Sequence, residues 1–140
     1  MISEYIGVFD SGVGGLTAVK EIMKEMPEQP IIYFGDTGRV PYGTKGRETI
    51  IKYVNGDIRF LKSFGVSAIV AACGTASSIA LPEIEDNDIP IIGVIEAAAE
   101  KAVKCTRNGR IGIIGTPGTI KSGAYEKLLK KKNSDINTVS

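Results

Sequence analysis

The sequence of 140 residues contains no histidine, no tryptophan and only two cysteines, Cys73 and Cys105. Without histidine, a Ser-His or Cys-His pair for nucleophilic catalysis is excluded. A zinc site is disfavoured as well, because histidine and cysteine supply most zinc ligands, so we expect no bound metal. Two cysteines are too few for a disulfide scaffold and are typical of a reducing compartment.

Long apolar runs are missing too. No stretch approaches the ~18 residues that a membrane span needs, so we expect no membrane partner. The N-terminus passes from Met1 into a short apolar run, without the basic and long apolar regions of a signal peptide. These features favour a cytoplasmic protein. What is present, 43% hydrophobic and 24% charged residues, fits a globular fold.

The net charge of +1 conceals an uneven distribution. Residues 1–100 carry 8 basic and 14 acidic side chains, whereas residues 101–140 carry 9 basic and 2 acidic ones. A basic segment can bind nucleic acid, but no aromatic residues interleave with the lysines of residues 127–132. We therefore expect a lysine-rich helix face that meets solvent or an acidic neighbour, and no nucleic-acid partner.

Short apolar runs alternate with helical patterns along the chain. Runs that are apolar throughout are typical of strands buried on both faces in a parallel sheet; they lie at residues 6–9, 31–35, 68–72, 91–95 and 111–115. Helical periodicity covers residues 16–26, 50–61, a short stretch after Cys73, 96–105 and a segment with Tyr125, Leu128 and Leu129. This alternation predicts an α/β fold with a doubly wound parallel sheet. We place a first domain at residues 1–95 and the start of a second, incomplete domain at residues 96–140.

Polar residues follow several of the predicted strands, where ligands bind in open α/β sheets. They are Asp10-Ser11, Asp36-Thr37, Cys73 with Thr75, Glu96, and Thr116 with Thr119. One interpretation makes Asp10, Ser11, Thr75 and Thr119 simple helix N-caps. The joint occurrence of Asp10, Asp36 and Cys73 favours a functional site.

A glycine cluster, Gly12–Gly15, opens the first predicted helix and offers backbone N–H groups to a small anion. It is not the dinucleotide fingerprint, because Thr17 stands where a third glycine is needed. The stretch from Gly115 to Ser122 imitates a phosphate loop, but Ile120 occupies the required glycine position. A flavodoxin-like domain with a phosphate ligand at Gly12–Gly15 stays open as an alternative.

Cys73 is the candidate base. It precedes a predicted helix start, and helix N-termini favour the thiolate form of cysteine, so we expect it to react faster than Cys105. Asp10 is available to orient it or balance its charge. The alternative is that Cys73 is a small buried apolar residue, the commonest fate of a free cysteine. We interpret Cys105 as structural.

Several motifs resemble the glutamate racemases of the aspartate/glutamate racemase superfamily. They are Gly7–Thr17, Gly35–Thr37, Val40–Lys45, Ala71–Cys73 with Thr75–Ser77, and Ile113–Thr116 with Thr119–Ser122 and Tyr125.

The resemblance implies a cofactor-independent, two-base interconversion of L- and D-glutamate for peptidoglycan synthesis, with glutamate as the small-molecule partner. Cys73 matches one catalytic cysteine, and Asp10 with Ser11 matches the loop that contacts the substrate amine and assists it. Tyr42 and Gly43 match the loop that holds a carboxylate. Thr75, Thr116 and Thr119 match further substrate contacts, as does position 74.

Two departures from the family pattern qualify these implications. The family has asparagine where this chain has Gly74, and its second catalytic cysteine lies in a later segment that we expect this chain to lack. We therefore expect no racemisation by the chain alone, and the alternative function is that of an inactive amino-acid-binding or regulatory remnant. An incomplete second domain also leaves an open edge, which favours self-association, most simply as a homodimer.

Overall fold

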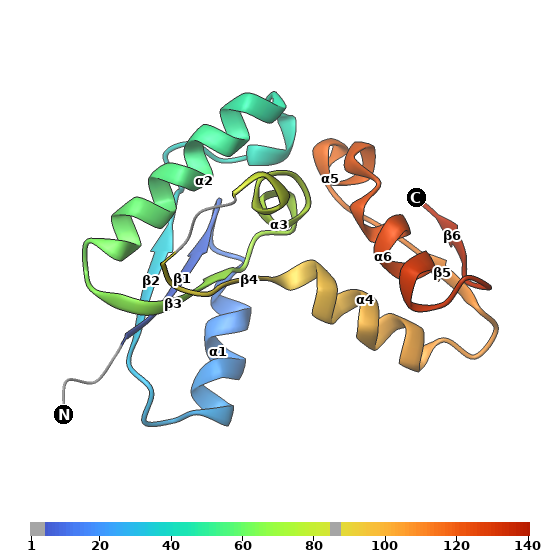
Figure 1. Cartoon of the computed structure of the whole chain (residues 1–140), viewed down its shortest axis with the longest axis horizontal. Coiled ribbons are helices and arrows are strands. Elements are labelled where there is room, and N and C mark those ends of the chain that lie inside the picture. The colour runs from blue at the N-terminus through green and yellow to red at the C-terminus, as the bar shows by residue number, and fades with distance from the viewer. Residues whose placement is uncertain (1–4, 85–87) are drawn as a thin grey trace.

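The computed structural model describes residues 5–84 and 88–140, which form two parallel β-sheets (Figure 1). The larger sheet has the strand order β2-β1-β3-β4 and the smaller one pairs β5 with β6. All ladders are parallel, as the sequence predicts. The strands are β1 (Tyr5–Asp10), β2 (Ile31–Gly35), β3 (Val66–Ala71), β4 (Ile91–Gly93), β5 (Arg110–Gly112) and β6 (Asn137–Val139).

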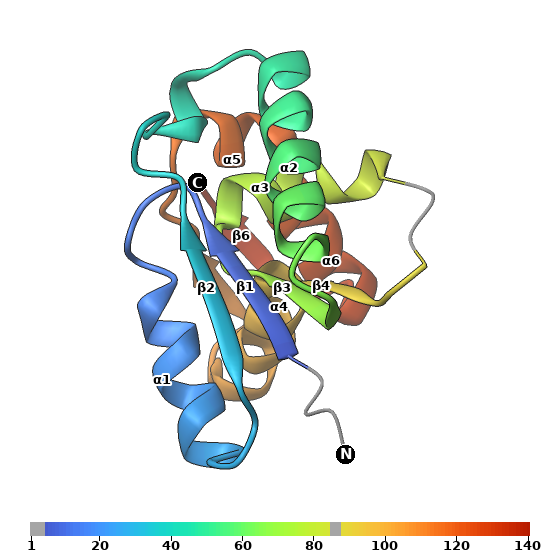
Figure 2. The ribbon, with the colours of Figure 1, turned by 90° about the vertical axis from the view of Figure 1, so that its left-hand side faces the viewer.

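Helices cover both faces of the larger sheet. Figure 2 shows α1 on one side of the strands and α2 on the other. The helices are α1 (Leu16–Glu25), α2 (Arg47–Lys62), α3 (Gly74–Ile79), α4 (Val94–Cys105), α5 (Pro117–Ser122) and α6 (Ala124–Lys132), with 3-10 turns η1 (Tyr42–Thr44) and η2 (Leu81–Glu83). The predicted α/β fold with a parallel sheet is confirmed. The boundary at residues 95 and 96 stays a prediction.

The main core lies between the sheet and α2. Apolar residues at helical spacing on α2, such as Ile50, Val54 and Leu61, are fully buried there. On the opposite face α1 buries none of its residues. The expectation that every strand is buried on both faces is therefore wrong: all of β2 is only half-buried, and Ile92 in β4 is 58% exposed.

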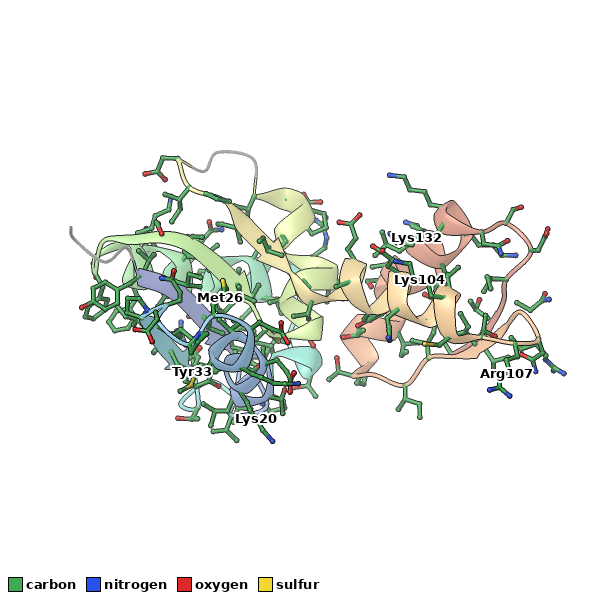
Figure 3. The ribbon with its side chains drawn as sticks, turned by 90° about the horizontal axis from the view of Figure 1, so that it is seen from below. Lys20, Met26, Tyr33, Lys104, Arg107 and Lys132 are labelled. Atoms are coloured by element: carbon green, nitrogen blue, oxygen red, sulfur yellow. The ribbon has the colours of Figure 1, made fainter. Side chains whose placement is uncertain are left out.

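A second, smaller core joins α4, α6 and the smaller sheet through Ala99, Leu129 and Ile136. The lysines of α6 meet both solvent and an acidic neighbour: Lys132 lies near Glu100 of α4, whereas Lys127, Lys130 and Lys131 are exposed. Glu100 lies 2.6 Å from Lys104 Nζ and 3.8 Å from Lys132 Nζ, and Figure 3 shows these two lysines close together. Part of the basic charge is thus balanced within the chain.

The observed elements differ from the predicted ones mainly at their ends. α4 begins at Val94 rather than near residue 96, and α1 ends at Glu25, one residue before Met26. α5, β6 and the two 3-10 turns were not predicted, because each is too short to show a clear hydrophobic period. Over the described residues, no helix is both long and apolar enough to cross a membrane.

Candidate active site

Cys73 and Ser11 meet where β1 and β3, which are neighbours in the sheet, come to their carboxyl ends. Cys73 Sγ lies 3.5 Å from Ser11 Oγ. Cys73 is also the N-cap of α3, and its sulfur accepts a hydrogen bond from the Ala76 N–H at 3.5 Å. The prediction that Cys73 opens a helix at this end of the sheet is confirmed.

The two cysteines differ in access. Cys73 is 5% exposed, whereas Cys105 lies exposed on the last turn of α4. Burial of Cys73 agrees with the interpretation of a small buried thiol as well as with that of a base held in a site. Access alone favours labelling of Cys105 first, against the order expected from the sequence.

Asp10 fixes the loop between β1 and α1. Its Oδ2 accepts a hydrogen bond from Gly15 N–H at 2.8 Å. This N–H group, which the sequence offered as a donor to an anionic ligand, is therefore already used by a carboxylate of the chain itself. This contact counts against a phosphate site at Gly12–Gly15. A Cβ at Gly15 would lie 2.8 Å from Asp10 Cβ and 3.0 Å from Ala72 Cβ. Glycine is therefore required there, and Asp10 is packed next to the residue that precedes Cys73.

Three threonine hydroxyls form a closed cluster between α3 and α5. Thr75 Oγ1 lies 2.9 Å from Thr116 Oγ1 and 3.3 Å from Thr119 Oγ1, and the last two are 3.0 Å apart. Each hydroxyl has one proton to donate, so the cluster keeps acceptor capacity but needs reorientation to donate to a ligand. Residues far apart in the sequence are thus brought together as predicted.

The N-cap interpretation of four candidate residues is wrong. The N-cap of α1 is Gly15, that of α3 is Cys73 and that of α5 is Thr116. Asp10, Ser11, Thr75 and Thr119 are therefore not the capping residues. Thr116, in contrast, accepts from Thr119 N–H at 3.3 Å, which is the usual Ncap–N3 bond.

Gly43, in η1, packs directly on Thr116. A Cβ built at Gly43 would lie 2.2 Å from both Thr116 Cβ and Thr116 Oγ1. A Cβ at Gly118, in α5, would come within 3.1 Å of Gly43 O. Figure 1 shows α5 alongside α3, so η1, α3 and α5 converge. The predicted carboxylate loop is therefore adjacent to the threonine cluster.

Gly74 leaves open space next to Cys73. No atom lies within 4 Å of a Cβ built at this position, and its φ is not in the left-handed region. The site thus has room for the asparagine side chain that the family resemblance implies here.

The carboxylate of Asp36 does not join Cys73 and Asp10, although the Asp36 backbone N–H donates to Asp10 O at 2.9 Å. The Asp36 carboxylate is hydrogen-bonded by Tyr42 Oη and ion-paired with Arg39, whose Nε lies 2.5 Å away. Both partners also bind Asp57, which is fully buried in α2 and was missed from the sequence. The helical spacing of Asp57 from Ile50 and Val54 places it on the apolar face, and this was the signal that could have found it.

A cavity of about 670 Å³ lies elsewhere, between the start of α2, the end of α3, and α5 and α6. Basic residues line it, among them Lys45, Arg47, Lys121 and Lys127, but Cys73 and Ser11 do not. Within residues 5–84 and 88–140, no three His, Cys, Asp or Glu side chains are grouped as a metal site would require.

Comparisons with known proteins agree with this geometry. A family model described as Asp/Glu/Hydantoin racemase matches residues 9–139. The glutamate racemase of Persephonella marina is 56% identical over 128 residues, which are 91% of this chain and 49% of that protein. The chain thus spans about half the length of the curated relatives that it matches.

Solved structures give the same result. Glutamate racemase from Francisella tularensis, in complex with D-glutamate, superimposes with a TM-score of 0.90 and 44% identity over 100% of this chain and 53% of that one. The Escherichia coli enzyme, in complex with L-glutamate and the activator UDP-MurNAc-Ala, gives 0.84 and 33%, covering 96% of this chain and 51% of that one. With its parallel sheet, its cysteine at the strand ends and these matches, the chain belongs to the Asp/Glu/Hydantoin racemase family.

Proposed function

We propose that the chain supplies one half of a glutamate racemase site, with Cys73 as one of two bases. The observation that carries this proposal is the contact of 3.5 Å between Cys73 and Ser11, beside the threonine cluster that joins α3 to α5. The related structures with D- and L-glutamate support glutamate as the substrate.

Each candidate residue has a role in this proposal. Cys73, as a thiolate, removes the α-proton and leaves the electron pair on the α-carbon; Asp10 assists through the loop that carries Ser11. Ser11 binds the substrate amine, and the N–H groups of Tyr42 and Gly43 bind a carboxylate. Gly74 and the threonine cluster (Thr75, Thr116 and Thr119) bind the remaining polar atoms. No cofactor is needed, because the protein groups alone move the proton, and D-glutamate would serve peptidoglycan synthesis.

The second candidate function is glutamate binding without turnover. Inversion needs an acid on the face of the α-carbon opposite the base, and one thiol cannot serve both faces. Cys105, the other cysteine of this chain, lies exposed at the C-terminal end of α4, whereas Cys73 is buried at the start of α3. This observation favours binding, or proton exchange on one face, for the chain alone.

An experiment in heavy water separates these functions. The chain is incubated with each glutamate enantiomer, and deuterium at the α-carbon and chirality are measured. Exchange without inversion, lost in Cys73→Ala and kept in Cys105→Ala, supports Cys73 as a base in half a site. Inversion that depends on Cys73 would reveal a second acid in this chain. If the chain shows no deuterium exchange and calorimetry detects no binding of glutamate, the proposal is refuted.

A further inference from the structure

Tyr42 is held from two sides by carboxylates in a buried cluster behind η1. Its Oη lies 2.7 Å from Asp57 Oδ2 and is also hydrogen-bonded with Asp36 Oδ2. Arg39 closes the cluster: its Nη2 lies 3.1 Å from Asp57 Oδ1, and its guanidinium stacks 4.6 Å from the centroid of the Tyr53 ring. Asp57 is 0% exposed and Tyr42 is 1% exposed. Asp57 and Tyr42 are therefore shielded from solvent, whereas the Arg39 side chain is 38% exposed and lies at the surface of the cluster.

If Asp36 and Asp57 are both ionised, the two hydrogen bonds at Tyr42 Oη have only one proton between them. A tyrosine hydroxyl has a single proton, so it can donate to one carboxylate only. Burial, followed by the bonds to both carboxylates, raises the pKa of Tyr42 well above its usual value, so the hydroxyl keeps that proton. A second full hydrogen bond forms only if one carboxyl is protonated and donates to Tyr42 Oη. Asp36 has the closer ion pair with Arg39, which leaves Asp57 as the donor.

We propose that Asp57 is a positioning residue for the candidate site: in its protonated form, it donates to Tyr42 Oη and fixes the Tyr42–Gly43 turn against Thr116. The part of this proposal that concerns glutamate rests on the function proposed above. Asp57 itself reaches the site only through Tyr42.

Tyr42 connects Asp57 to the candidate site, and the turn that contains Tyr42 is tightly packed. Tyr42 and Gly43 are consecutive in η1, which is closed by a hydrogen bond of 2.9 Å from Lys45 N–H to Tyr42 O. Gly43 packs on Thr116 so closely that no side chain fits between them. A displacement of the Tyr42 ring therefore moves the N–H groups proposed to bind the carboxylate.

The charges around Asp57 come from two segments. Asp36, Arg39 and Tyr42 face it from the loop after β2, and Tyr53 lies on its own helix. Burial raises the pKa of Asp57 most. Donation from Tyr42 Oη to the ionised carboxylate lowers it, Asp36 raises it and Arg39 lowers it, with a result of about 6. Asp57 thus loses its proton close to neutral pH, so the effect of that loss on the Gly43 N–H can be followed by titration.

Two measurements test the proposal on the chain and three variants. The first follows the Gly43 amide signal by NMR between pH 5 and pH 7. The second measures the Kd for glutamate by calorimetry at pH 5.5. Asp57→Asn keeps an N–H donor for Tyr42 but cannot titrate, and Asp57→Leu removes the bond. Glu48→Gln, a neutralised carboxylate on the exposed part of the same helix, is the control.

We expect the Gly43 signal to shift with a midpoint near pH 6 in the native chain and in Glu48→Gln, and to stay constant in Asp57→Asn. Asp57→Asn should bind glutamate within about twofold of native and Asp57→Leu about tenfold more weakly, as for one lost hydrogen bond. A constant native signal, or Asp57→Asn binding as weakly as Asp57→Leu, would overturn the proposal.

The two proposals fail in different ways. If the native chain binds no glutamate, the proposed function fails, while the Gly43 titration still decides whether Asp57 positions the turn. If Asp57→Leu does not fold, the comparison of native chain, Asp57→Asn and Glu48→Gln carries the test.

Discussion

The contact between Gly43 and Thr116 predicts that Gly43→Ala separates the two halves of the candidate site. A Cβ at Gly43 would lie 2.2 Å from Thr116 Cβ, so Thr116 must retreat by about 1.2 Å to reach the 3.4 Å at which ordinary contact begins. Such overpacking costs about 1–3 kcal/mol. Thr116 is also the N-cap of α5, and loss of that cap adds about 1 kcal/mol. We expect a total loss of about 2–4 kcal/mol.

Urea unfolding followed by circular dichroism measures this loss. Gly38→Ala, in the same loop, is the control because no atom lies within 4 Å of a Cβ built there. The double variant Gly43→Ala/Thr116→Gly should recover most of the stability, because it removes the atoms that collide while glycine is still an acceptable N-cap. If Gly43→Ala unfolds at the same urea concentration as Gly38→Ala, the direct packing of η1 on α5 is refuted.

Three further predictions concern single residues. Gly74→Asn should leave the fold intact, since the position is open, and should tighten glutamate binding by one hydrogen bond to a charged group, about 1.5–3 kcal/mol; a calorimetric titration without gain would contradict this. Because Cys105 is exposed and Cys73 is buried, iodoacetamide should modify Cys105 first in the folded chain and both equally in urea, as read by mass spectrometry; early labelling of Cys73 would show that the site opens. The pKa of Asp57 is raised to about 6 from an ordinary 3.8, so folding takes up a proton between these two pH values and the free energy of unfolding falls as the pH rises from 4 to 7. This fall, relative to Asp57→Asn, is at most about 3 kcal/mol, less after solvent screening. Equal urea midpoints at pH 5 and pH 7 would contradict this prediction.

The sheet was predictable because its strands are short apolar runs that end in glycine or polar residues. The pattern in β1 and β3 placed Ser11 and Cys73 at the same edge, where the structure has them 3.5 Å apart. Their proximity follows from topology alone, since β1 and β3 are parallel neighbours.

The sequence placed Thr75, Thr116 and Thr119 at one end of the sheet, but it did not predict their direct contact, which depends on packing across long distances in the chain. Thr75 and Thr119 are separated by 44 residues, and only the docking of α5 on α3 brings their hydroxyls together. α5 itself has six residues, too few for a helical period. Asp57 was overlooked because a carboxylate within an apolar pattern is usually solvated, and its partners come from a loop.

The uneven packing of the larger sheet has a consequence for the order in which the fold opens. α1 buries no side chain, with Leu16 and Met23 50% and 59% exposed, whereas Val8 and Phe9 of β1 are fully buried. Amide protons of α1 should therefore exchange with solvent well before those of β1, because few contacts oppose its local unfolding. The loop that begins at Ser11 joins a strand whose last four residues are buried to a helix that buries none. We expect the hydrogen bond from Gly15 N–H to Asp10 to keep the candidate site at the end of β1 formed while α1 frays.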